Sequence, residues 1–167
     1  MLCLCGCSNI AEHDFSDCIF CEIKTNPHNH YTIWEDDDYM AFLSIYPNTD
    51  GVTVVIPKSH YSSNVDKINN KVLVGLVIAA KEVTSLLKLA FPDVGRFAFV
   101  IEGLGVNHLH IKLFPLHGTA DPQRKFKSKI NVYSATYEGY ISTHNYYDYP
   151  QSKLKQIHKH ILQGKSR

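Results

Sequence analysis

The chain has 167 residues, which suits one domain or one domain with an appendage. Hydrophobic residues make up 44% of it, and the formal net charge is +1 with histidine neutral. This balance gives no general attraction to nucleic acid or to a membrane surface, so neither is expected as a partner. No run approaches the ~18 consecutive apolar residues of a membrane helix. The start lacks the basic and apolar regions of an export signal, so we expect a cytoplasmic protein.

Five cysteines occur near the start of the chain. In the cytoplasm they favour metal binding or free thiols over disulfides. Residues 1–16 are predicted to form a flexible N-terminal arm, which holds Cys3, Cys5 and Cys7. Cys18 and Cys21 form a Cys-x-x-Cys pair in a short predicted helix. Such a pair can bind Zn²⁺ or act in redox chemistry, but redox pairs usually follow a strand, and none is predicted there.

Hydrophobic periodicity predicts a regular order of elements between the cysteine pair and the middle of the chain. Apolar residues recur at helical spacing over 70–90, and Pro92 stops that long helix. A dense turn at 47–51 separates the early strands from the next one. The strands are expected at 31–35, 39–45, 52–56 and 97–101.

The stretch from Val106 to Pro115 alternates polar and apolar residues, as a half-buried strand does. Its apolar members are expected in the core, and Pro115 is expected to end the strand. Its polar members are expected to point outward together, and they are His108, His110 and Lys112. Two imidazoles and an ammonium can hold phosphate, and an imidazole can be a nucleophile or a metal ligand. The alternative is an ordinary solvated face.

Residues 119–167 are predicted to be a C-terminal extension with a short helix at 154–162. Its first part, 121–129, is basic and irregular. We expect a solvated loop there, and contact with phosphate is the less favoured alternative. No internal repeat or second core is evident.

Four motifs stand in a fixed order along residues 18–117. They are Cys18-Ile-Phe-Cys21-Glu-Ile, Phe42-Leu43, Val55-Ile56-Pro57-Lys58-Ser59-His60, and His108-x-His110 followed by apolar residues. In this order and spacing they resemble the histidine triad (HIT) family of nucleotide hydrolases and transferases, in particular its zinc-binding bacterial type.

The resemblance implies an α+β, HIT-like fold over residues 17–118, with a mainly antiparallel five-stranded sheet and one long helix. It also implies a homodimer and attack on the α-phosphate of a nucleotide substrate. By position, the nucleophile is His110, which forms a phosphoramidate that water cleaves. The expected substrate is a dinucleoside polyphosphate or a nucleoside phosphoramidate.

Zinc-bearing members of the family use two cysteines and two histidines, which correspond here to Cys18, Cys21, His60 and His108. Two thiolates and two imidazoles make a closed tetrahedral site, so the implied zinc is structural. The alternative is two buried free cysteines and two unrelated histidines.

The chain departs from the family pattern on the substrate side. Lys112 stands at the third triad position, where it can neutralise phosphate but donates protons less readily than histidine. Ser44 replaces an aspartate that grips ribose, and Val52 replaces a histidine. The glycine turn around Gly105 and Asn107 is short. Ser44, Gly105, Asn107 and Lys112 remain the expected substrate-binding residues, and His117, Arg124 and Lys125 are further candidates. These changes leave open a non-catalytic or weakly active nucleotide-binding module stabilised by zinc.

Overall fold

The computed structural model describes residues 18–27, 30–125, 127, 132–137 and 145–165. The predicted arm at 1–16, its three cysteines and Lys129 lie outside these residues. No helix in the described part of the chain is long and apolar enough to cross a membrane.

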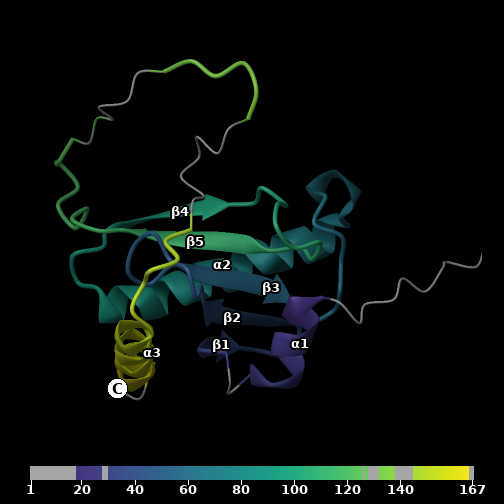
Figure 1. Cartoon of the computed structure of the whole chain (residues 1–167), viewed down its shortest axis with the longest axis horizontal. Coiled ribbons are helices and arrows are strands. Elements are labelled where there is room, and N and C mark those ends of the chain that lie inside the picture. Colours follow the sequence, from purple (N-terminus) through teal and green to yellow (C-terminus); the bar gives the residue numbers. More distant parts are fainter. Residues whose placement is uncertain (1–17, 28–29, 126, 128–131, 138–144, 166–167) are drawn as a thin grey trace, which may run out of the picture.

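A five-stranded antiparallel sheet forms the centre of the protein, with strand order β1-β2-β3-β5-β4 (Figure 1). The strands are β1 (Thr32–Glu35), β2 (Tyr39–Leu43), β3 (Thr53–Pro57), β4 (Arg96–Val100) and β5 (Ile111–Leu116). The helices are α1 (Ile19–Thr25), α2 (Asn70–Ala90) and α3 (Gln151–Lys165), with a 3₁₀ turn at Val65–Lys67. The predicted α+β class, with five antiparallel strands and one long helix, is confirmed.

The two faces of the sheet are covered differently. The long helix α2 packs on one face and buries the alternate residues Leu109, Ile111 and Leu113, as predicted. On the other face, which we call the outer face, α1 packs through Phe20 and Ile23. They contact Met40, Phe42, Val54 and Ile56 of β2 and β3. The strand begins at Ile111 and not at His108 as expected, so strand alternation places Lys112, opposite Val54, on the outer face but does not reach the two histidines. His108 and His110 belong to the same face because the Phe20 ring of α1 contacts both of their rings.

The expected end of the last strand is wrong, because β5 continues through Pro115 to Leu116. Pairing of β5 with β3 stops at Leu113, whereas pairing with β4 continues and sets Pro115 opposite Phe97. A proline is tolerated where a strand has a neighbour on one side only, since no ladder bond is lost there.

The C-terminal helix α3 shares the core instead of standing apart from it. Leu154, Ile157 and Ile161 are buried in the cluster that also contains α2. The carboxylate of Asp50, in the turn before β3, accepts hydrogen bonds from Tyr149 Oη at 2.8 Å and from Lys153 Nζ at 2.7 Å. These bonds hold the start of α3 against the turn before β3.

Candidate metal centre and nucleotide site

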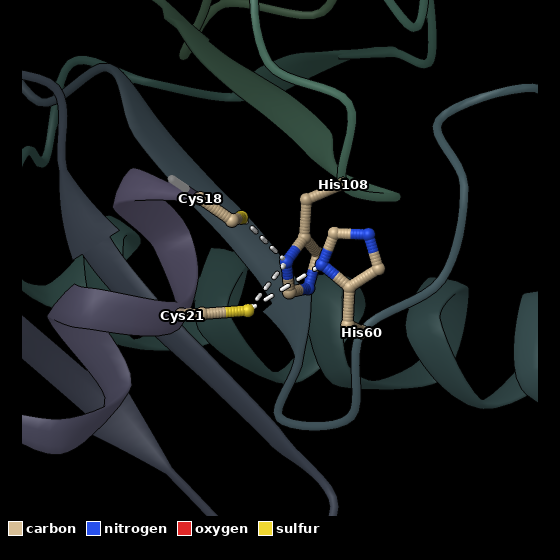
Figure 2. A group of neighbouring side chains, drawn as sticks. All are labelled: Cys18, Cys21, His60 and His108. Atoms are coloured by element: carbon tan, nitrogen blue, oxygen red, sulfur yellow. Dashed lines mark hydrogen bonds between the residues drawn. The ribbon is translucent and has the colours of Figure 1, made fainter. Parts of the chain in front are cut away.

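Four metal-ligating side chains from three separate segments converge at one end of the outer face (Figure 2). Cys18 and Cys21 are three residues apart at the start of α1, so both thiols lie on the same side of that helix. His60 comes from the loop after β3, and His108 from the segment that leads into β5. Their ligand atoms all lie within 4.8 Å of one another.

The hydrogen bond of His108 fixes which of its nitrogens can bind a metal. Its Nε2 lies 2.9 Å from the carbonyl oxygen of Pro57, and a carbonyl can only accept. Nε2 therefore carries the proton, and the lone pair of Nδ1 faces the two thiols. Burial lowers the pKa of His108 to about 4, with smaller effects from nearby positive groups, so the ring is neutral at pH 7. A carbonyl partner behind a ligating imidazole is the usual arrangement in metal sites.

The spacing of these atoms fits a tetrahedral zinc ion. Nδ1 of His108 lies 3.4 Å from Sγ of Cys18 and 3.7 Å from Sγ of Cys21, and Nδ1 of His60 lies 3.4 Å from Sγ of Cys21. Zn–S and Zn–N bonds of about 2.3 and 2.0 Å at the tetrahedral angle separate S and N by roughly 3.5 Å. Burial and the adjacent Cys18 raise the pKa of the Cys21 thiol. A bound cation would offset this rise by stabilising both thiolates.

His110 is buried, and the expectation that its imidazole stands exposed is wrong. The side chain is only 2% exposed, because the Phe20 ring of α1 lies edge-on to it at 5.4 Å between centroids. Nδ1 of His110 lies 2.7 Å from the carbonyl oxygen of His108, so Nδ1 carries the proton and Nε2 the lone pair. Burial and the positive charge of Lys112 lower the pKa of His110. The ring is therefore a neutral potential nucleophile near pH 7.

Lys112 forms an ion pair with Glu102, which was not predicted from the sequence as a site residue. Its Nζ contacts Oε1 of Glu102, whose side chain is only 7% exposed, and Tyr137 Oη donates to the other carboxylate oxygen at 3.3 Å. The pairing of Val100 with Lys112 across β4 and β5 brings Glu102 alongside. The sequence signal for Glu102 was weak, because an acidic residue in a glycine turn is ordinarily solvated.

The other predicted substrate residues separate into two groups. Ser44, Lys112 and Phe114 meet at a small cavity of about 30 Å³ on the outer face, where Ser44 Oγ accepts from the Tyr46 N–H at 3.3 Å. Gly105 lies elsewhere, with φ +85° and open space where a Cβ would be. The amide oxygen of Asn107 accepts from the Ser63 N–H at 3.1 Å, so Asn107 fastens the loop that follows His60.

The further candidates in the basic region also make structural contacts. Nδ1 of His117 lies 3.1 Å from the carboxylate of Asp93, and its Nε2 lies 3.0 Å from the Asp50 carbonyl oxygen. Arg124 donates to the carbonyl oxygen of Gly118 at 3.1 Å. Neither lines the cavity beside Ser44.

Comparison with known proteins matches this chain to one protein family. The HIT domain profile matches residues 26–119. An uncharacterised HIT-like protein of Mycoplasma genitalium is 33% identical over 108 residues, which cover 62% of this chain and 76% of the relative.

Two solved structures share the fold at low identity. A hypothetical histidine triad nucleotide-binding protein from Sulfolobus tokodaii aligns with a TM-score of 0.63 and 21% identity, over 88% of this chain and 91% of its own. A zinc-bound histidine triad family protein from Mycobacterium smegmatis aligns with a TM-score of 0.60 and 17% identity, over 90% of this chain and 97% of its own. With the profile match over more than half of its length, the chain belongs to the HIT domain family.

Proposed function

We propose that this chain is a nucleotide phosphohydrolase or nucleotidyl transferase that acts at the α-phosphate, with His110 as the nucleophile. The observation that carries the proposal is the tautomer of His110. Its Nδ1–H is held by the carbonyl of His108, so the Nε2 lone pair lies on the outer face that also carries Lys112 and Ser44. A neutral imidazole in this state forms covalent phosphoryl intermediates readily.

The reaction takes place in two displacements. Nε2 of His110 first bonds to the α-phosphorus, and the bond from phosphorus to the leaving group breaks, with the electron pair going to that group. Lys112 stabilises the charge on the phosphate oxygens and can donate a proton to the leaving group. A water or acceptor hydroxyl then attacks phosphorus, the P–N bond breaks, and the proton released restores Lys112.

The burial of His110 adds a requirement to this proposal. Because the Phe20 ring covers the imidazole, that ring must move when a substrate arrives. The planar base of a nucleotide is a suitable replacement partner for an aromatic edge, since stacked and edge-to-face pairs are both favourable. Phe20 is therefore assigned to contact with the nucleoside.

We propose that Cys18, Cys21, His60 and His108 hold one structural zinc ion. Support comes from the ligand spacing, the His108 tautomer and the zinc-bound relative. The ion would join α1 to the segment that leads into β5, and so keep the Phe20 ring in contact with His110. The closed ligand set leaves no position for a catalytic water.

We also propose a homodimer. The strand β4 lies at the edge of the sheet, and its Phe99 is 41% exposed. Apolar Val74, Val77 and Ile78 are exposed on α2. An edge strand can pair with a second copy, and exposed apolar residues on a helix can pack against one. Light scattering on the purified chain would measure its mass, and a monomer at micromolar concentration would contradict the dimer.

A second function is a nucleotide-binding module without efficient chemistry. It is favoured by the Lys112–Glu102 pair, which already neutralises the cation, and by Ser44, whose single hydroxyl holds a ribose diol less well than a carboxylate.

The test of the enzyme proposal is a panel of diadenosine polyphosphates and adenosine phosphoramidates. We expect turnover of at least one compound, with a nucleotidyl adduct on the peptide that contains His110 detected by mass spectrometry after rapid acid quenching. Tight nucleotide binding with neither turnover nor adduct would favour the binding module.

A further inference from the structure

The segment that leads into α3 runs alongside the turn between β2 and β3 (Figure 1). The backbone N–H of Tyr146 donates to the carbonyl oxygen of Tyr46 at 3.4 Å. The ring of Tyr147 packs against the ring of Tyr46, with 4.8 Å between centroids. Further along, Tyr149 Oη donates to the Asp50 carboxylate at 2.8 Å. Contacts near both of its ends therefore hold this part of the C-terminal extension beside the turn.

These contacts bring Asn145 to the small cavity beside Ser44. Asn145 lines that cavity together with Ser44 and Lys112, and it is exposed, so a ligand can reach it. Nδ2 of Asn145 donates to Tyr147 Oη at 3.3 Å, and the Tyr147 ring packs on Tyr46. The Tyr46 N–H donates to Ser44 Oγ at 3.3 Å. A continuous chain of contacts thus joins the amide of Asn145 to the hydroxyl of Ser44.

The size of the cavity limits what can enter it. About 30 Å³ has room for one or two groups the size of a water molecule, since roughly 10–15 Å³ of such volume holds one. A hydroxyl group fits, whereas an aromatic base does not. The lining residues with hydroxyl, amide or ammonium groups are Ser44, Asn48, Lys112 and Asn145. The cavity therefore suits the hydroxyl groups of a sugar whose phosphate lies at Lys112.

An amide supplies what Ser44 lacks. A carboxylate can accept hydrogen bonds from both hydroxyls of a ribose, whereas Ser44 has a single oxygen. Because Nδ2 of Asn145 is engaged by Tyr147, the amide oxygen is the group left to accept from a ligand. The amide is uncharged, so it adds an acceptor beside Lys112 without adding a second anion to the one supplied by Glu102.

We propose that Asn145 is a specificity residue, which accepts a hydrogen bond from a ribose hydroxyl of the bound nucleotide beside Ser44. Ser44 and Asn145 together take the place of the aspartate that the resemblance implies at position 44. The inference rests on the proposed function and deepens it, because it gives a binding role to a residue outside the HIT profile match at 26–119.

The test measures binding by calorimetry, with adenosine monophosphate and 2′,3′-dideoxyadenosine monophosphate as probes. The second probe lacks both ribose hydroxyls, and neither carries a leaving group, so neither is consumed. Asn145→Ala removes the amide, and Asn145→Asp keeps an oxygen acceptor at the same place. Asn70→Ala, an exposed asparagine at the start of α2, is the matched control.

We expect the unmodified chain to bind adenosine monophosphate at least about tenfold more tightly than the dideoxy probe, as two or more hydrogen bonds allow. Asn145→Ala should lower this ratio roughly three- to tenfold, the effect of one such bond, while affinity for the dideoxy probe changes less than about twofold. Asn145→Asp and Asn70→Ala should both keep the ratio.

Three results would overturn the inference. They are equal binding of the two probes by the unmodified chain, a ratio that Asn145→Ala leaves unchanged, and an equal loss of affinity for both probes in Asn145→Ala. The last result would show that Asn145 acts only on the structure of the site.

Turnover of the dinucleotide and phosphoramidate panel separates this inference from the proposed function. A ratio that falls in Asn145→Ala, without turnover and without an adduct on His110, keeps the role of Asn145 and rejects the enzyme. Turnover with a ratio that Asn145→Ala leaves unchanged keeps the enzyme and rejects the role of Asn145. If adenosine monophosphate does not bind and no compound is turned over, both are rejected.

Discussion

Two neighbouring sites on the outer face, the Cys₂His₂ cluster and the proposed phosphate-binding face, differ in how closely they match the pattern that the resemblance implies. The cluster has a cysteine or histidine at each of the four positions that the resemblance implies, and its four ligand atoms lie within 4.8 Å of one another. Lys112, four residues after His108, and Ser44 depart from the pattern that the resemblance implies, and the buried carboxylate of Glu102 pairs with Lys112. The cluster needs four specific side chains, whereas a phosphate-binding face needs only a suitable sum of charges. The cluster should therefore lose its ion when any one ligand is replaced, whereas the phosphate face can keep its charge with a different set of residues.

The largest expected effect is on the phosphate face, through the nucleophile. His110→Ala should reduce turnover by at least about 10³-fold, because the other side-chain nitrogens of this face are engaged elsewhere, His108 with the thiols of the cluster and Lys112 with Glu102. Steady-state hydrolysis of the best substrate measures it. His160→Ala, an exposed histidine on α3, is the control and should retain full activity. Similar losses in both variants would show that His110 acts through stability alone.

Next in size is the loss of the cluster. Cys21→Ser should remove bound zinc and lower the stability of the chain by more than about 3 kcal/mol, since binding of structural zinc contributes directly to folding. Elemental analysis and thermal unfolding measure the two effects. A variant with Cys3, Cys5 and Cys7 all changed to serine should keep its zinc. A wild-type chain that is folded and free of metal would reject the site.

The Lys112–Glu102 pair should set the pH dependence of the nucleophile. Activity needs neutral His110, so it falls as the pH drops through the pKa of that ring, which burial and Lys112 hold below 6.5. Lys112→Ala removes a positive charge and should move this acid limb to higher pH, with a roughly 10- to 100-fold loss of rate. Glu102→Gln removes a negative charge and should move it lower.

Profiles of kcat/KM against pH measure both shifts. Lys112→Arg keeps the charge and should leave the position of the limb in place. If both substitutions move the limb in the same direction, the charges of this pair do not tune His110.

The smallest expected effect is that of Asp50, which lies outside both sites. Asp50→Asn loses the ion pair with Lys153 and weakens the bond from Tyr149, so it should destabilise the chain by roughly 1–2 kcal/mol. Burial alone would raise the pKa of Asp50, but these hydrogen bonds outweigh it and lower the pKa below 3.8.

The stabilisation by Asp50 is thus present above about pH 4 and is lost as the pH falls through the lowered pKa. Urea unfolding at pH 7 and pH 3 measures it. Asp148→Asn, an exposed neighbour, should have little effect. Loss of zinc in Asp50→Asn would show that α3 and the cluster are coupled.

Much of the fold could be predicted from local pattern. The helix at 70–90 was correct because apolar residues at helical spacing and Pro92 mark it independently of the rest of the chain. The strand at 39–45 extended too far, since β2 ends at Leu43, where the chain turns toward the next strand. The end of β5 was wrong because tolerance of Pro115 depends on a missing neighbour strand, which no local pattern records.

The sequence by itself determined the resemblance to the family and, through that resemblance, the antiparallel sheet and the four residues that converge as candidate zinc ligands, because a resemblance depends only on residue types in a fixed order along the chain. Only the tertiary structure decided that Phe20 covers His110, that Glu102 neutralises Lys112, and that Asn145 lines the cavity beside Ser44. The physical reason is distance along the chain. These three features come from α1, the turn after β4 and the segment before α3, and only the packed sheet brings them together on one face.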